Sequence, residues 1–421
     1  MKRPTKVEQI LFLLLIVLLP AQIGKHFWPP TAFVRGIRID YLSPTIFATD
    51  LILIAMLISW AARARGKTIV NILEKHKRSI GVFIALLLLM ALNIAISTNP
   101  LSTLYYWLRL GELALLFFYL KSVPKSTTGA LRKLLPLPVI YSSTIAIIQF
   151  VKQGSVGGLL YWLGERSFTI ATPGIAKAES LGRLLLRPYA TFPHPNALAG
   201  FIVVSLVLLL PLMERKQGRD TYTKVVLPLA FILGAITLLL TFSLSGWIAA
   251  ALLAILAKAL KDKRKMLPSA ALVVLGLTVA VVAFPPEKES ISNRLTVAKH
   301  AQTMIRESPL TGVGLGNFIP SLSQQPNQGS LPLQSPFLFY QPVHNIYLLL
   351  AAEAGLIALG LFAWFMAGAL RNAKRKERTN IFLALVGILM IGAVDHYWLT
   401  LHQTRLLFTI TLALAWRKEN S

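Results

Sequence analysis

Long apolar runs recur along most of the chain, separated by short polar or basic stretches. A helix that crosses a bilayer needs about 20 mostly apolar residues. About twelve runs approach that requirement, and they cover residues 7–23, 43–60, 79–97, 101–120, 134–151, 196–213, 225–241, 246–260, 267–284, 345–370, 380–398 and 402–416. The pattern predicts an all-α polytopic membrane protein with about twelve transmembrane helices.

Composition supports the same class. The 421 residues are 55% hydrophobic and 14% charged, whereas a soluble domain carries about 25% charged residues. The first run follows Lys2, Arg3 and Lys6, as in a signal peptide. No small-residue cleavage site appears before Lys25, and further spans follow, so we expect a retained first helix. Residues 1–421 are expected to form a single integral membrane domain.

The net charge of +26 is explained by membrane topology. With the N-terminus placed in the cytoplasm, most Lys and Arg residues fall on the cytoplasmic side, and the C-terminus is cytoplasmic too. No base-reading or RNA-stacking motif accompanies the charge, which argues against a nucleic-acid partner. The chain has no cysteine, which excludes disulfides, thiolate metal sites and cysteine nucleophiles.

Two long outer loops are predicted, at about 152–194 and 285–343, and loops of this length are usually functional or disordered. The second loop contains a predicted surface helix, about 289–306. Its expected apolar face comprises Leu295, Ala298, Met304 and Ile305. Ser321–Ser335 is rich in Gln, Pro and Ser and is expected to act as a lid.

The first long loop ends in Arg187-Pro-Tyr-Ala-Thr-Phe-Pro-His194-Pro-Asn196. Two readings stay open. In one, prolines stiffen the lead-in to a helix and Asn196 is its N-cap. In the other, Arg187 and the helix N-terminus form an approach for an anion, because a guanidinium fork and free backbone N–H groups both suit phosphate oxygens.

Three glycines follow the predicted surface helix, at Gly312, Gly314 and Gly316. Their spacing differs from the dinucleotide fingerprint, and no Lys-Ser/Thr pair follows as in a P-loop. We therefore expect a turn whose backbone passes close to another surface.

His344 opens the next apolar run, and Asn345 follows it. Imidazole suits proton transfer near neutral pH, although a histidine at a membrane interface also serves as an anchor or helix cap. Glu353 is half a turn off the face of His344 and deeper along the helix, so it is not expected to orient the imidazole. Asp395 lies near the outer end of its span, on the same side as His344.

Other ionisable residues also lie inside predicted spans, where charge is costly and usually functional. Arg109 and Glu112 are three residues apart, so mutual pairing is expected. No His-Glu-x-x-His pair or equivalent ligand set appears, and no Gly-x-Ser-x-Gly elbow. We expect neither a metal nor another cofactor.

Taken together, these motifs resemble the O-antigen ligase and O-antigen polymerase family of membrane glycosyltransferases. The resemblance is strongest from about 187 to 400. It is carried by the Arg187 to Asn196 lead-in, by Arg294 followed by Pro309–Phe318, and by His344-Asn-Ile-Tyr-Leu with Glu353-x-Gly355. At Thr241-Phe-Ser-Leu-Ser-Gly the family often has Ser-Arg-Gly. Leu244 takes the arginine's place, so the role of that basic group is open.

The resemblance implies a glycosyltransferase of the C superfamily at the outer face of the bacterial cytoplasmic membrane. The donor is expected to be an undecaprenyl-diphosphate-linked glycan, and the acceptor a sugar hydroxyl on lipid A–core or another surface glycan. His344 is the expected general base, with inversion at the anomeric carbon. The expected substrate-binding residues are Arg187, Arg294, Arg109, Asn345, Asp395, His194 and Asn196.

Two alternatives stay open. A polymerase would join lipid-linked repeat units instead of transferring the glycan to its anchor. A lipid-linked glycan flippase would also have many spans, but transporters tend to show internal repeats and broken midplane helices, and no repeat is visible here.

Overall fold

The computed structural model describes residues 4–64, 77–180, 182–214, 221–261, 288–324, 340–376 and 378–417. The chain divides into two compact units. Unit 1 comprises residues 1–11, 24–123 and 288–368, and unit 2 comprises residues 12–23, 124–287 and 369–421.

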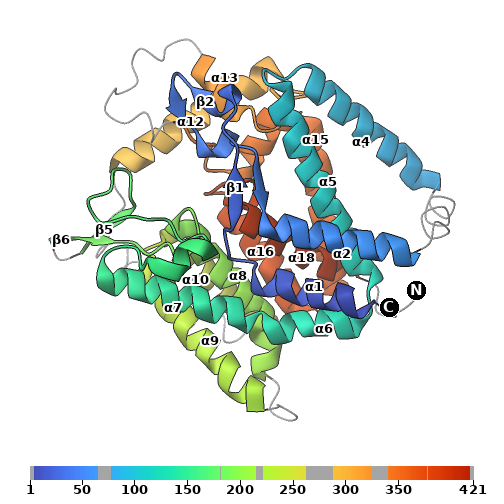
Figure 1. Ribbon diagram of the computed structural model, residues 1–421. Coiled ribbons are helices and arrows are strands. Elements are labelled where there is room, and N and C mark those ends of the chain that lie inside the picture. Colours follow the sequence, from blue (N-terminus) through green and yellow to red (C-terminus); the bar gives the residue numbers. More distant parts are fainter. Residues whose placement is uncertain are drawn as a thin grey trace. The chain divides into compact units, whose positions relative to one another are not determined.

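Helices dominate the described residues (Figure 1). The longer ones are α1 (Lys6–Val17), α2 (Ala48–Ala64), α4 (Lys77–Ala95), α5 (Pro100–Ser122), α6 (Lys125–Leu134), α7 (Pro136–Lys152), α8 (Pro195–Glu214), α9 (Thr221–Leu240), α10 (Leu244–Lys261), α12 (Lys288–Glu307), α15 (Ile346–Arg375), α16 (Thr379–Gly392) and α18 (His402–Trp416). Shorter ones are η1 (Pro30–Ala32), η2 (Asp40–Leu42), η3 (Gly158–Leu163), α13 (Phe318–Gln324) and α17 (Tyr397–Thr400).

Within the described part of the chain, the strands form three small antiparallel pairs. They are β1 (Gly24–His26) with β4 (Thr45–Phe47), β2 (Phe33–Val34) with β3 (Ile37–Arg38), and β5 (Lys177–Ser180) with β6 (Arg183–Leu186).

The predicted spans within the described residues are largely helical. Three boundaries were wrong. The span predicted at 7–23 is helical only to Val17, and the span at 43–60 includes strand β4 before α2 begins. The span at 380–398 ends as α16 at Gly392, before a turn and α17. The span at 267–284 lies outside the described residues. Among the described helices, Gly129–Lys152, Pro195–Met213 and Ile346–Arg375 are long and apolar enough to cross a membrane. The number of twelve spans stays a prediction.

Unit 2 is a helical bundle. Helix α7 packs along α9, and α8 packs against α9 and α16 (Figure 1). Helix α18 is buried along most of its length and lies against α16. An apolar helix buried on all sides belongs in the core of a bundle, so α18 forms part of the interior of unit 2.

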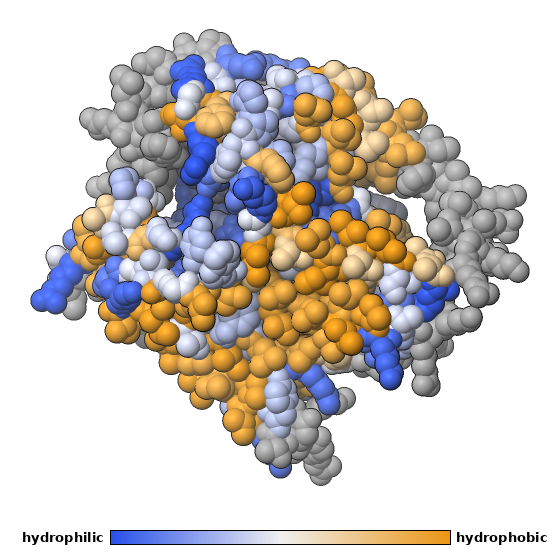
Figure 2. Space-filling model, in the orientation of Figure 1, coloured by the Kyte–Doolittle hydropathy of each residue, from blue (hydrophilic) through white to orange (hydrophobic). Residues whose placement is uncertain are grey.

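The outward face of α9 is apolar. Its exposed large side chains follow helical spacing, at Val225, Leu229, Ile232, Ile236 and Leu239. Figure 2 shows apolar side chains spread over this part of the surface. Water would penalise so large an apolar stripe, whereas lipid would solvate it. Together with the candidate spanning helices, this stripe identifies a membrane protein.

The first long loop has an ordered scaffold. Gln149 near the end of α7 accepts hydrogen bonds from the backbone N of Tyr189 (2.9 Å) and Ala190 (2.8 Å) and donates to buried Glu165 (2.8 Å). Tyr189 packs with Phe168 in a small apolar cluster, and burial raises the pKa of its hydroxyl. This scaffold holds the segment that leads into α8.

Helix α15 is broken at Gly355, which has φ 82° and ψ 172°. The break leaves backbone groups without their helical partners, and residues 309–314 supply replacements. Val313 N donates to the Ala352 carbonyl (2.9 Å), and Gly314 N donates to the Glu353 carbonyl (2.9 Å). On the other side of the break, Leu356 N donates to the Pro309 carbonyl (2.8 Å). The loop therefore supplies hydrogen-bond partners for the backbone groups that the break in α15 leaves unpaired.

We predict that Gly355→Ala destabilises the protein by about 1–3 kcal/mol, because it forces a non-glycine residue into a left-handed conformation. A Cβ at this position would also lie 2.1 Å from the Leu310 carbonyl oxygen. Gly360→Ala is the matched control, since nothing lies within 4 Å of a Cβ there. Thermal unfolding in detergent should show a lower Tm for Gly355→Ala alone; equal Tm values would contradict this account of the break.

Candidate active site

His344 lies directly before α15 in unit 1 and is half-buried. Asn345 is the N-cap of this helix: its Oδ1 accepts hydrogen bonds from the backbone N of Tyr347 (2.8 Å) and Leu348 (2.9 Å). A capping side chain fixes the direction in which the chain enters a helix. The pair His344-Asn345 therefore places an imidazole at a defined helix N-terminus.

Glu353 takes part in the contact with the glycine-rich loop. Its Oε1 accepts a hydrogen bond from the backbone N of Phe318 (3.1 Å), and its carbonyl accepts from Gly314 and from Asn93 Nδ2 (3.0 Å). The segment Glu353–Gly355 is therefore the part of α15 against which the glycine-rich loop packs.

The three loop glycines confirm the predicted close backbone approach. Gly312, Gly314 and Gly316 all have positive φ. A Cβ would lie 2.4 Å from the Glu353 backbone at the first and 2.2 Å from the Tyr106 ring at the third. Glycine is required here for conformation and for space.

Two buried asparagines, missed at the sequence level, fasten this loop. Asn93 Oδ1 accepts from Leu315 N (3.1 Å), and its Nδ2 donates to the Thr311 carbonyl (2.8 Å). Asn317 Oδ1 accepts from Asn99 N (2.8 Å), and its Nδ2 donates to a threonine hydroxyl. An amide inside an otherwise apolar predicted span, as at Asn93, is the sequence signal that marks such a position.

Helix α12 (Lys288–Glu307) confirms the surface helix predicted at about 289–306. Arg294 lies on this helix and is half-buried. The predicted apolar face was wrong at Leu295, which is 60% exposed. The buried residues are Val297, Ala301 and Met304, whose spacing of four and three puts them on one face. Leu295 is about 200° from Val297 around the helix and so points away.

Of the predicted lid, Ser321–Gln324 belongs to α13 and the remainder lies outside the described residues.

In unit 2 the structure brings four of the predicted site residues together. Arg187 donates through Nη2 to Asn196 Oδ1 (2.5 Å), and Asn196 Nδ2 donates to Asp395 Oδ2 (3.0 Å). His194 Nδ1 accepts from the backbone N of Asn196 (3.1 Å). Asp395 Oδ1 accepts from the backbone N of His396 (2.9 Å).

The predicted N-cap at Asn196 was therefore wrong. Helix α8 begins at Pro195, so Asn196 is its second residue and His194 occupies the cap position. Proline is favoured at the first helical position because it has no N–H to satisfy, which moves the cap one residue earlier. The freed amide of Asn196 instead links a guanidinium to a carboxylate.

Arg187 also donates through Nε to the Thr241 carbonyl (2.7 Å). Thr241 lies in the turn before α10, whose first residue is Leu244. A guanidinium therefore reaches the turn that precedes Leu244.

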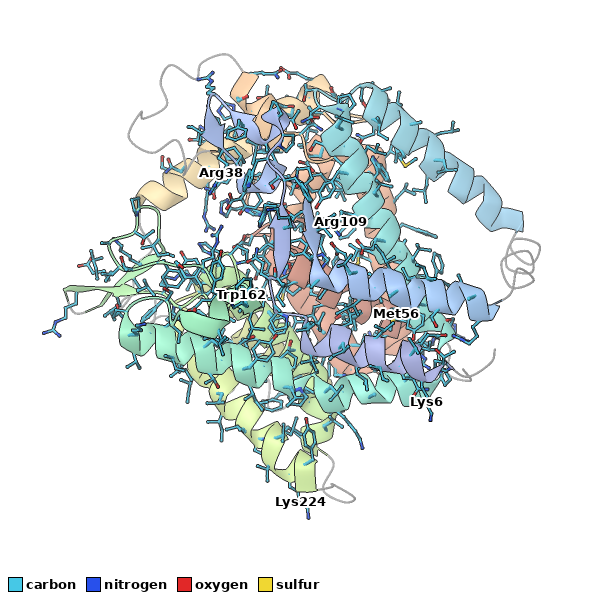
Figure 3. All side chains as sticks on the ribbon, viewed as in Figure 1. Lys6, Arg38, Met56, Arg109, Trp162 and Lys224 are labelled. Carbon is cyan, nitrogen blue, oxygen red and sulfur yellow. The ribbon has the colours of Figure 1, made fainter. Side chains whose placement is uncertain are left out.

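Arg109 holds unit 1 together. It lies in α5 (Figure 3) and pairs with Asp50 Oδ1 (2.7 Å) and with Glu112 Oε2 (2.8 Å). The second contact confirms the expected local pair. Its Nε donates to the Tyr105 hydroxyl (3.1 Å), and Nη2 donates to the Thr45 carbonyl. All three guanidinium nitrogens are engaged by the protein, so Arg109 serves the fold; its binding of substrate remains a prediction.

Comparison with known protein families gives a match to the middle part of the chain. Residues 229–363 match the family model described as O-antigen ligase. The matched segment covers less than half of the chain and is similar to that family. Comparison with curated proteins gives no match. The matched segment contains Arg294, the glycine-rich loop, His344 and the broken helix, so the resemblance drawn from these motifs is confirmed.

We predict that Asn345→Ala lowers stability by about 0.5–2 kcal/mol, because α15 loses the acceptor for its first N–H groups. Asn345→Asp should retain most of the stability, since a carboxylate oxygen also caps well. Thermal unfolding of the two purified variants measures the difference. Identical Tm values for Ala and Asp would show that the cap contributes nothing.

Proposed function

We propose that the protein transfers a glycan from an undecaprenyl-diphosphate donor to a sugar hydroxyl of lipid A–core or another surface glycan. The O-antigen ligase domain supports glycan transfer in lipopolysaccharide formation as the general role. The donor, the acceptor and the mechanism belong to the proposal. So does the location, which is the outer face of the bacterial cytoplasmic membrane in a multi-pass topology.

One observation carries the mechanism. His344 stands at the capped N-terminus of α15, inside the segment that matches the ligase model. The N–H groups at a helix N-terminus favour negative charge. An imidazole placed there is suited to accept a proton from an acceptor hydroxyl while an anionic donor is bound nearby.

In the proposed step, the acceptor hydroxyl attacks the anomeric carbon as His344 takes its proton. The bond from that carbon to the diphosphate oxygen breaks, and the lipid diphosphate leaves with the bonding electrons. Direct displacement inverts the anomeric configuration. Arginines stabilise the departing charge without a metal. Arg294 is proposed for this role within unit 1.

The cluster around Arg187 in unit 2 is proposed to bind a substrate phosphate. Its guanidinium is held by Asn196 and by the Thr241 carbonyl, so it is preorganised. We propose that it supplies the basic group absent at Leu244. His194 and Asp395 in turn accept hydrogen bonds from Asn196 and hold it in position.

A ligase is proposed over a polymerase because the matching family model is described as a ligase. The two differ in what accumulates when the gene is deleted. Loss of long chains with build-up of lipid-linked polymer supports ligation, whereas build-up of single repeat units supports polymerisation.

We predict that His344→Ala lowers transfer by about 10²–10⁴-fold, as expected for loss of a general base. Binding of the lipid-linked donor should be unchanged. The assay uses protein reconstituted in liposomes, with EDTA present, because the proposed step uses no metal. His300→Ala on α12 is the control and should retain turnover. Wild-type turnover by His344→Ala would overturn the assignment.

We predict that Arg294→Ala weakens donor binding and slows transfer together, while Arg294→Lys retains part of both, because lysine keeps the charge but loses the planar fork. Arg306→Ala, an exposed position in the last turn of α12, is the control. Equal donor binding by wild type and Arg294→Ala would contradict the diphosphate role.

A further inference from the structure

A pocket of about 520 Å³ opens in unit 1, and its lining includes neither His344 nor Arg294. It lies where the β2–β3 hairpin, the start of α5 and helix α13 meet; Figure 1 shows β2 beside α13. Sites for small molecules usually measure about 300–1,000 Å³, so the pocket is large enough for a ligand.

The lining combines three kinds of group. Hydroxyls and amides come from Thr31, Thr98, Asn99 and Gln324, and the Phe33 ring, 41% exposed, provides an aromatic surface. The charged residue among the lining residues is Arg35. An aromatic ring beside hydroxyls and amides suits the faces and hydroxyls of a sugar, and a guanidinium suits a carboxylate or phosphate.

Arg35 occupies an unusual position in the backbone. Val34 pairs with Ile37, so Arg35 and Gly36 form a two-residue hairpin turn, and their φ angles are 49° and 78°. Such turns favour Asn-Gly because both residues need positive φ. An arginine at the first position is unfavourable for the turn, so its side chain has another use.

The side chain of Arg35 is also held in place. Its Nη2 donates to the Ser323 carbonyl of α13 (3.1 Å). This bond joins the hairpin to α13 at the pocket and uses one of the five guanidinium donors. The remaining donors are oriented before any ligand arrives, which reduces the cost of binding.

We propose that this pocket is a binding subsite for a saccharide that carries a carboxylate or phosphate group. Arg35 pairs with the anionic group, and Phe33 lies against the sugar ring. The proposal rests on the proposed function, since a glycan transferase handles such saccharides, and it assigns part of glycan recognition to a place other than His344.

The hairpin offers a substitution that separates folding from binding. Arg35→Asn removes the charge but places the preferred residue in the turn, so the Tm should stay the same or rise. Binding is measured by isothermal titration calorimetry on the full-length protein in detergent. The probes are digalacturonic acid, its uncharged methyl diester, glucose 1-phosphate and inorganic phosphate.

Wild type should bind at least one charged saccharide about tenfold or more tightly than Arg35→Asn does, as expected for loss of a charge-assisted bond. The methyl diester should bind weakly to both proteins. Arg38→Gln is the matched control: Arg38 stacks on Trp28 at 4.6 Å, is absent from the pocket lining, and should leave binding unchanged.

Three outcomes would overturn the inference: no binding of either charged saccharide, equal binding by Arg35→Asn, or inorganic phosphate binding as tightly as the saccharides. His344→Ala should bind the saccharides like wild type. A wild-type protein that binds them but transfers no glycan would overturn the proposed function alone. Normal transfer without binding would overturn this inference alone.

Discussion

The break in α15 at Gly355 is the constraint on which unit 1 depends. A helix interrupted inside an apolar region exposes backbone N–H and C=O groups that lipid cannot satisfy. Here the segment from Pro309 to Gly314 satisfies them on both sides of the break. The helix that carries His344 at its start is therefore locked to the segment that follows α12, and neither can be understood alone.

In each unit, amide side chains hold loops in place through several hydrogen bonds. In unit 1, Asn93 and Asn317 hold the glycine-rich loop through donors and acceptors on the same side chain. In unit 2, Gln149 holds the first long loop, and Asn196 links Arg187 to Asp395. A neutral amide makes several bonds without the desolvation cost of a charge, which suits it to an interior that borders lipid.

Charge is used where neighbouring groups can neutralise it. Arg109 engages Asp50, Glu112 and backbone or hydroxyl oxygens, so its guanidinium is fully solvated by protein. Arg187 donates hydrogen bonds to a backbone carbonyl and to an amide oxygen, and both orient its guanidinium.

The sequence predicted features that depend on neighbours in the chain. The Arg109–Glu112 pair follows from spacing, and the three glycines implied a close approach. The surface approached was not predictable, because the apolar pattern of α15 continues through Gly355 and gives no sign of the break. The N-cap of α8 was predicted one position wrong, at Asn196. Whether Asn196 or His194 caps the helix depends on whether Pro195 is its first residue. The predicted apolar face of α12 was wrong at Leu295, because the position of a side chain around a helix depends on its angle as well as on its residue type.

The anomeric configuration of the transferred glycan tests the central claim most directly. The product made by the reconstituted protein from a donor of known configuration can be analysed by NMR of its anomeric proton and carbon. Direct attack by an acceptor hydroxyl that His344 deprotonates predicts inversion relative to the donor. Retention would require a covalent glycosyl–enzyme intermediate or another two-step route, and would contradict the account.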